Sequence, residues 1–162
     1  MHGHFTYDYA TIRVVPKVER EEFVNVGVIV SCPARGFLEA CIELDEQRLM
    51  ALDSTLDVKA IRDYLAIIPT ICTGGDQAGP IGQLLQRERF YWLVAPRSTI
   101  IQTSSVHTGF CKNPAAVLER LLNAMVRPCT KPPAGAAELV GTFEDTGWAE
   151  EGGNVLDLWS GS

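Results

Sequence analysis

Hydrophobic and polar residues alternate with a period of two along residues 23–32, which is typical of a β-strand with one buried face. The even positions form the apolar face: Val24, Val26, Val28, Val30 and Cys32. Residues 37–44 alternate in the same way. Between the two runs, Pro33 presets the first dihedral angle of a turn, and Gly36 accepts a left-handed conformation. The pattern therefore predicts a β-hairpin.

Three more segments are rich in the β-branched and aromatic residues that strands favour. Residues 7–15 carry Tyr, Ile, Val and Thr and predict the first strand of the chain. Residues 89–95 and 99–107 predict two further strands, which a short connection at residues 96–98 joins into a second hairpin. The chain is therefore expected to form an antiparallel sheet of about five strands.

Three helices are predicted from their start signals and their apolar stripes. Asp45 can cap a short helix, and Asp57 can cap a longer one that Pro69 ends or kinks. Asn113 followed by Pro114 is a strong start for the last helix, because proline suits the first helical position. The buried stripes of the two longer helices fall at helical spacing, at Val58, Ile61, Leu65 and Ile68, and at Val117, Leu118, Leu121, Leu122 and Met125.

The predicted order of elements is β-β-β-α-α-β-β-α, with a glycine-rich loop at residues 73–82. Since no βαβ crossover is evident, we expect a two-layer α+β domain over residues 5–127, with an antiparallel sheet and helices packed on one face. Residues 128–162 are expected to form a Pro/Gly-rich linker and an acidic tail. All 14 Lys and Arg lie in residues 1–131, together with 14 acids, whereas the last 31 residues hold six acids and no base.

This charge distribution leaves the predicted domain neutral, so the basic face of a nucleic-acid-binding protein is not indicated. No stretch approaches the ~18 apolar residues that a membrane helix needs. The first residues lack the pattern of a secretory signal, so we expect a cytoplasmic protein that binds no membrane. The five cysteines are odd in number and form no Cys-x-x-Cys pair, which predicts reduced thiols. No metal and no cofactor are expected.

Four segments, in this order along the chain, resemble a known family. They are residues 7–9 with 12–14, residues 21–29 (EEFVNVGVI), residues 90–97 (FYWLVAPR) and residues 99–109 (TIIQTSSVHTG). Through them, the run from Tyr7 to Arg127 resembles the uncharacterised bacterial family known as domain of unknown function 3037. The resemblance implies no established activity and no catalytic residues. Members of the family are often encoded beside HipA-like kinases of toxin–antitoxin systems, which implies a role with a protein partner.

Several polar residues interrupt the predicted strands. Arg13 lies in an otherwise apolar first strand and Asn25 in the second, Arg97 lies in a turn, and Gln102 and His107 lie in a strand that is unusually polar. An arginine on an inner strand needs a partner, and its planar fork suits a carboxylate or a phosphate. If the five side chains converge on one side of the sheet, they form an anion-binding groove in which His107 can act as an acid or base.

Simpler roles remain open for the same positions. Arg13 can pair with Glu22 or Glu43 instead, and His107 can hydrogen-bond within a turn. Gly27 can admit a ligand or mark a β-bulge, and we favour the bulge. Cys111 is the best candidate for a reactive thiol, although an inert cysteine is the simpler interpretation.

No catalytic constellation emerges from these residues, since nucleophilic catalysis needs a nucleophile beside a base. In the acidic tail, Leu156, Leu158 and Trp159 predict a segment that docks on a partner. The sequence therefore favours a non-catalytic binding or regulatory module that acts with a protein partner, for which a HipA-like kinase is the candidate. The alternative is a small enzyme, or a binder of a nucleotide or phosphate ligand, that uses the predicted Arg/His/Asn groove.

Overall fold

The computed structural model describes residues 3–129, which form an α+β fold with an open antiparallel sheet. The strands are β1 (Phe5–Val14), β2 (Val24–Cys32), β3 (Phe37–Ile42), β4 (Ile101–Thr103) and β5 (His107–Cys111). The helices are α1 (Glu46–Leu52), α2 (Val58–Thr73), α3 (Gly79–Gly82), α4 (Gln86–Val94) and α5 (Pro114–Met125). Short 3₁₀ helices cover Val18–Arg20, Pro33–Arg35 and Asp76–Ala78. The prediction of an antiparallel sheet of about five strands is confirmed.

The sheet is built around β1. Its strand order is β3-β2-β1-β4, and β5 pairs with β1 as well, so β4 and β5 share the edge of β1 that β2 leaves open. The predicted strand at residues 99–107 is thus two short strands rather than one. The first predicted hairpin is confirmed: the Gly36 backbone has a φ of 58°, and its N–H donates to the Pro33 carbonyl at 3.0 Å.

The second predicted hairpin is wrong, because residues 89–95 belong almost entirely to helix α4. The carboxylate of Glu88 accepts a hydrogen bond from the Leu85 N–H at 3.0 Å, which satisfies a donor at the helix start. Phe90 and Leu93, which are three residues apart, are both buried against the sheet. The strand preference of this aromatic run is therefore overridden by packing, as expected for a preference that depends on context.

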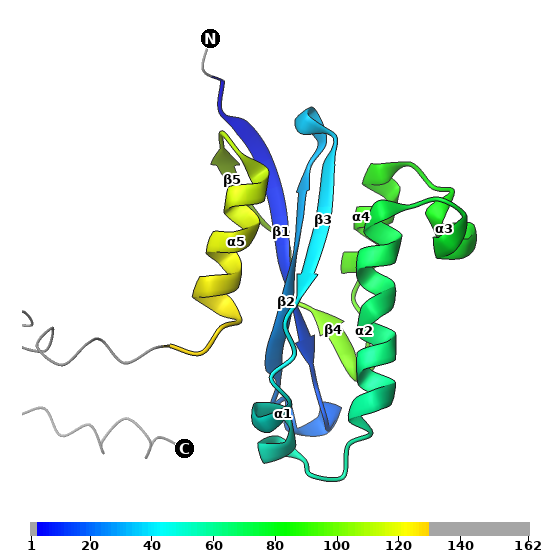
Figure 1. Cartoon of the computed structure of the whole chain (residues 1–162), viewed down its shortest axis with the longest axis vertical. Helices are drawn as coiled ribbons and strands as arrows, with labels where there is room; N and C mark the ends of the chain where they lie inside the picture. Colours follow the sequence, from blue (N-terminus) through cyan, green and yellow to red (C-terminus); the bar gives the residue numbers. More distant parts are fainter. Residues whose placement is uncertain (1–2, 130–162) are drawn as a thin grey trace, which may run out of the picture. The chain divides into compact units, whose positions relative to one another are not determined.

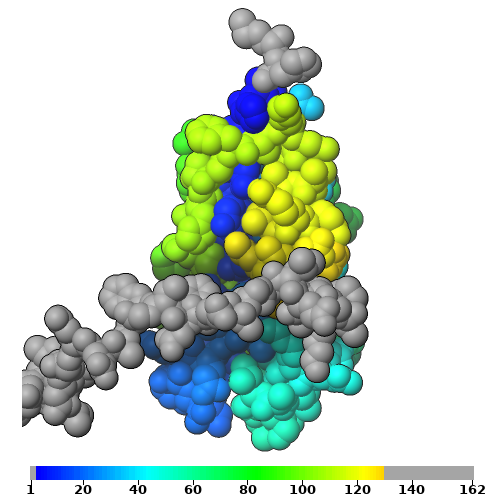
Figure 2. Space-filling view, turned by 90° about the vertical axis from the view of Figure 1, so that its left-hand side faces the viewer, coloured from blue at the N-terminus to red at the C-terminus, as the bar shows by residue number. Residues whose placement is uncertain are grey.

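The helices cover both faces of the sheet, so the prediction of a single covered face is wrong (Figure 1). Helices α2 and α4 pack on one face, where they enclose Ile12, Val14 and Ile29. Helix α5 packs on the other face, where it encloses Val28 and Val30. Figure 2 shows α5 in yellow beside the yellow-green segment that contains β4 and β5, with blue β1 visible between them. Strand β2 is consequently buried on both sides, and the predicted element order lacks helices α3 and α4.

A β-bulge in β2 explains why the alternation of its sequence misled the prediction. Ile12 of β1 pairs with Gly27 and Arg13 pairs with Asn25, so β2 supplies one extra residue, Val26. Because of this extra residue, Val26 faces α2 whereas the next even position faces α5. A Cβ atom on Gly27 would lie 2.6 Å from the Cys41 carbonyl oxygen, so the close approach of β3 requires glycine. The favoured interpretation of Gly27 as a bulge is confirmed.

The predicted helix starts are confirmed by side-chain caps. Asp45 accepts a hydrogen bond from the backbone N–H of Arg48, Asp57 from that of Ala60 and Asn113 from that of Ala115. Pro69 lies inside α2, which continues to Thr73. These caps need only neighbouring residues, which is why the sequence predicts them well.

The glycine-rich segment at residues 73–82 folds around the buried side chain of Arg89 from α4. The Arg89 Nη1 donates to the carbonyls of Ile71 at 2.8 Å and Cys72 at 2.6 Å, and its Nε donates to the Leu84 carbonyl at 3.2 Å. Arg89 is only 9% exposed. A cation at the C-terminal end of α2 satisfies carbonyls that the helix leaves unpaired and complements its dipole. Arg89 therefore joins α2 to α4.

Three side chains fix the end of α5 to the sheet and to α1. Arg127 donates to both carboxylate oxygens of Glu43, the residue that follows β3, at 2.9 and 2.7 Å. Asn25 Nδ2 donates to the Met125 carbonyl at 3.1 Å, and Arg48 Nη1 donates to the Val126 carbonyl at 3.1 Å. The fork of Arg127 holds the pKa of the Glu43 carboxyl below its ordinary value through their hydrogen bonds.

We expect Arg89→Met to lower the free energy of unfolding by about 3 kcal/mol, because the buried carbonyls of Ile71 and Cys72 and the partly buried carbonyl of Leu84 lose their donor. Urea denaturation followed by circular dichroism measures this loss. Arg87→Met is the matched control on the same helix, since the Arg87 guanidinium is exposed and bonds only to the Tyr91 hydroxyl among the described residues. Equal midpoints for the two variants would contradict the structural role of Arg89.

We expect Glu43→Gln to lower the melting temperature slightly at pH 7, because the Arg127 fork then faces a neutral amide. The pKa of Glu43 is lowered in the folded chain, so its stabilising contribution is full above the ordinary value of 4.5 and is lost as pH falls through the folded-state pKa. The melting temperatures of the wild type and the variant should therefore converge below pH 4.5. Thermal unfolding from pH 3 to pH 8, with Glu39→Gln as the control, tests this, and a constant difference would count against it.

Candidate functional site

Three of the five predicted ligand-binding residues form a row across the sheet. In the strand register, Arg13 of β1 pairs with Asn25 of β2 on one side and with Gln102 of β4 on the other. Ile12 and Val14 are fully buried in the core beneath α2, so Arg13 between them points to the opposite face. The sequence indicated these three residues as candidates for ligand binding, but only the strand register shows that they are neighbours.

Arg13 lines a polar pocket of about 370 Å³, here called the Arg13 pocket. Its lining residues are Arg13, Val15, Val18, Glu21, Phe23, Arg97, Ser98 and Gln102. The Arg13 guanidinium lies 4.1 Å from the centre of the Phe23 ring, and its Nε is buried without a hydrogen-bond partner. The alternative pairing of Arg13 with Glu22 or Glu43 is not observed, since these carboxylates bind Arg20 and Arg127.

Asn25 lies on the same face but lines no part of the Arg13 pocket. Its amide nitrogen is used to hold the end of α5 at Met125, and its Oδ1 is buried without a partner. The position of Asn25 is therefore explained first by the packing of α5. The sequence gives no sign of this long-range contact, because the two residues are far apart along the chain.

Arg97 follows α4 and binds its last turn. Its Nη2 donates to the Trp92 carbonyl at 2.7 Å and its Nη1 to the Leu93 carbonyl at 3.4 Å, while its guanidinium lies 4.4 Å from the centre of the Trp92 ring. These contacts cap the helix and hold the indole in place. Arg97 also lines the Arg13 pocket, so the structure places these two arginines around one cavity.

His107 lies apart from the other candidates. It begins β5, where it pairs with Tyr9, and the two rings are 5.3 Å apart. Tyr9 is four residues from Arg13 along β1, which corresponds to about 13 Å. His107 is exposed and does not line the Arg13 pocket, so the predicted acid–base group does not accompany the arginine there.

Burial disfavours the thiolate form of Cys72 and Cys111. All five cysteines are free, and burial raises the pKa of the Cys111 thiol above its ordinary value. Burial also raises the pKa of Cys72 to about 12. A thiol with a raised pKa carries little thiolate at neutral pH, so the structure favours the inert interpretation of Cys111.

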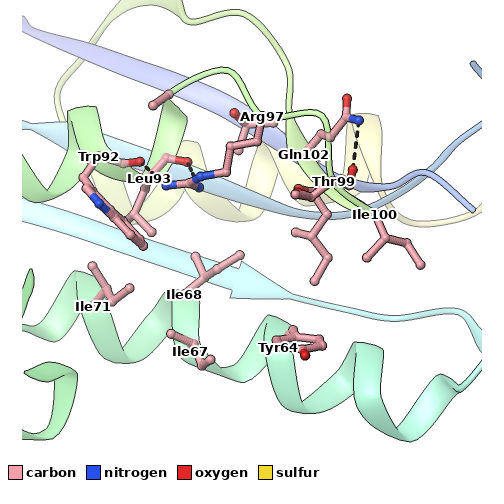
Figure 3. Close-up of a pocket in the computed structure, with 13 residues that line it drawn as sticks. Tyr64, Ile67, Ile68, Ile71, Trp92, Leu93, Arg97, Thr99, Ile100 and Gln102 are labelled. Carbon is pink, nitrogen blue, oxygen red and sulfur yellow. Dashed lines mark hydrogen bonds between the residues drawn. The ribbon is translucent and has the colours of Figure 1, made fainter. Parts of the chain in front are cut away.

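A second cavity was not predicted from the sequence. This apolar groove, of about 440 Å³, runs between α2 and the segment from the end of α4 to β4 (Figure 3). Its lining residues are Tyr64, Ile67, Ile68, Ile71, Trp92, Leu93, Ala95, Arg97, Thr99, Ile100, Ile101, Gln102 and Thr103. Figure 3 shows the α2 side chains on one wall, with Trp92 and Arg97 facing them from the other.

The apolar groove exposes large hydrophobic side chains. Tyr64 is 60% exposed, Ile67 is 50% exposed and Trp92 is 40% exposed. The predicted stripe of α2 includes Ile61, Leu65 and Ile68, which face the sheet, whereas Tyr64 and Ile67 extend the apolar surface beyond it. The apolar residues Tyr64 and Ile67 beside the stripe could have indicated this groove from the sequence. The opposite wall was missed because residues 89–95 were predicted as a strand.

These features define the class of protein: an α+β domain, with an antiparallel sheet flanked by helices and a cavity beside its edge strand β4. A family model described as protein of unknown function (DUF3037) matches residues 9–126. The match covers most of the chain, and the protein belongs to this family. No curated protein and no solved structure matches the chain.

The rest of the described chain adds two observations. Between residues 3 and 129, no helix is both long and apolar enough to cross a membrane. The same part of the chain contains no cluster of three or more His, Cys, Asp or Glu side chains arranged to hold a metal ion. The predicted docking residues Leu156, Leu158 and Trp159 lie outside the described residues.

Proposed function

We propose that this protein is a non-catalytic binding module and that its apolar groove receives a row of hydrophobic side chains from a protein partner. The observation that carries the proposal is the exposure of Tyr64, Ile67 and Trp92 around one continuous groove. Large apolar surface that stays open to solvent in a folded domain is typical of an interaction site.

The composition of the groove suits a protein partner. Tryptophan, tyrosine and arginine are the residue types that most often dominate the binding energy of interfaces, and Trp92, Tyr64 and Arg97 stand together here. Tyr64 and Ile71 are seven residues apart on α2, so this wall is about 10 Å long, or two helical turns. A partner helix can place two or three apolar side chains along such a wall.

The charge at the rim sets the orientation of the partner. Arg97 is exposed and bonds to two backbone carbonyls, so among residues 3–129 no carboxylate neutralises it. A partner segment with an acidic residue beside its apolar row therefore matches the groove. The family resemblance makes a HipA-like kinase the first partner to test.

The test is co-expression of the full chain with a HipA-like kinase, followed by pull-down and calorimetry. We expect a complex, and we expect Ile67→Gln to weaken it about tenfold or more, because an anchor side chain is lost from the groove. Kinase activity measured with and without the protein shows whether binding is regulatory.

Phe110→Gln is the matched control. Phe110 is 73% exposed in β5 and does not line the apolar groove, so its replacement removes a similar apolar side chain elsewhere. Equal loss of affinity in both variants would contradict the groove as the binding site. Absence of both a complex and an effect on kinase activity would contradict the kinase as the partner.

A further inference from the structure

We propose that the Arg13 pocket binds a small ligand through an oxyanion, either a phosphate monoester or a carboxylate, held by the guanidinium of Arg13. Arg13, the proposed binding group, is not part of the partner groove, because it points to the face of the sheet opposite α2. Arg97 and Gln102 line both cavities. Its ligand contacts would come from the row formed by β1 and β4 and from Phe23 at the wall of the pocket.

The first support is the unpaired nitrogen of Arg13. Buried nitrogens in folded proteins nearly always have a hydrogen-bond partner, and an exception calls for a bound water, ion or ligand. The Arg13 Nε is buried and has none. No ion pair within residues 3–129 includes Arg13, so neither this donor nor the charge of the guanidinium is satisfied by a carboxylate there.

The second support is the geometry of the donors. The guanidinium carbon of Arg13 lies 4.1 Å from the centre of the Phe23 ring, and no side-chain hydrogen bond among residues 3–129 uses the N–H groups of this guanidinium. Gln102, the cross-strand neighbour of Arg13, uses one amide hydrogen to bind the Thr99 carbonyl at 2.9 Å. Its second amide hydrogen remains available to the same ligand.

The third support is the charge of the walls. Arg13 and Arg97 both line the pocket, and Glu21 is the one carboxylate among its lining residues. The fork of Arg97 is engaged with carbonyls of α4, so Arg97 contributes positive charge rather than a fork to the ligand. The pocket is therefore net positive, and about 370 Å³ is enough for a small ligand with one ring and one oxyanion.

The direct test observes the Arg13 Nε–H itself. The full chain, labelled with ¹⁵N, is titrated with phenyl phosphate, inorganic phosphate and benzoate while the arginine Nε–H resonances are recorded by NMR. We expect the resonance of Arg13, assigned by its loss in Arg13→Lys, to shift on binding of at least one probe. The probe with the strongest effect tells a phosphate ligand from a carboxylate ligand, and the comparison with inorganic phosphate shows whether the ring contributes.

Variants then locate the site. Arg13→Met should weaken binding of the best probe about tenfold or more, since a charge-assisted hydrogen bond is lost. Arg13→Lys keeps the charge but loses the planar fork, so it should bind the probe several-fold more weakly than the wild type. It also keeps the test valid if Arg13→Met fails to fold. Glu21→Gln should strengthen binding. Arg35→Met is the matched control, because Arg35 also lies over an aromatic ring, that of Phe5 at 5.1 Å, outside this pocket.

The outcomes separate clearly. A shift of the Arg13 Nε–H together with selective loss of affinity in the Arg13 variants supports an oxyanion site. No shift with any of the three probes, or equal affinities in Arg13→Met and Arg35→Met, overturns it and leaves bound water as the partner of the nitrogen. Neither result depends on the apolar groove, so failure here is distinct from failure of the partner experiment.

Discussion

The buried guanidinium of Arg89 is the interaction on which the helical side of this domain depends. It sits at the C-terminal end of α2 and donates to carbonyls of Ile71, Cys72 and Leu84. A Cβ atom on Gly74 would lie 2.5 Å from its Nη1, so the glycine-rich turn is shaped to admit this side chain. Since α2 and α4 supply facing walls of the apolar groove, the hydrogen bonds of Arg89 help to hold these walls in place.

The burial of β2 on both faces is the corresponding constraint within the sheet. Every residue of β2 except Asn25 is buried, with α2 on one side and α5 on the other. The bulge at Val26 and Gly27 moves the even-numbered apolar positions of β2 from one core to the other. Asn25, the exception, lies just before the bulge, and its amide nitrogen donates a hydrogen bond to the Met125 carbonyl at the end of α5. The polar row across the sheet thus begins at the place where the covering helix ends.

The two proposed sites meet at Arg97. Its guanidinium caps α4 and supports Trp92 in the groove, while the residue also lines the Arg13 pocket. Gln102 lines both cavities as well. Since these two residues touch both cavities, occupancy of one can change the position of side chains that line the other. A ligand with differential contacts in this region is the kind of effector that couples two sites.

The sequence by itself determined the features that depend on neighbouring residues. The turn at Pro33–Arg35, the helix starts at Asp45, Asp57 and Asn113, and the apolar stripe of α5 all follow from local hydrogen bonds and helical periodicity. Three site candidates were also found: Arg13 interrupts an apolar strand, Gln102 lies in an unusually polar one, and Arg97 lies in the turn before it.

Only the tertiary structure decided which face each helix covers and whether residues 89–95 form a strand or a helix. The reason is that Phe90 and Leu93 gain their burial from the sheet and from α2, which lie far away in the sequence. The same holds for Gly27 at the bulge, where the carbonyl oxygen of Cys41 on the next strand leaves no room for a side chain. Local pattern therefore specifies the first hairpin turn and the helix starts, whereas long-range packing selects the type of an element, the face it covers and the cavities between elements.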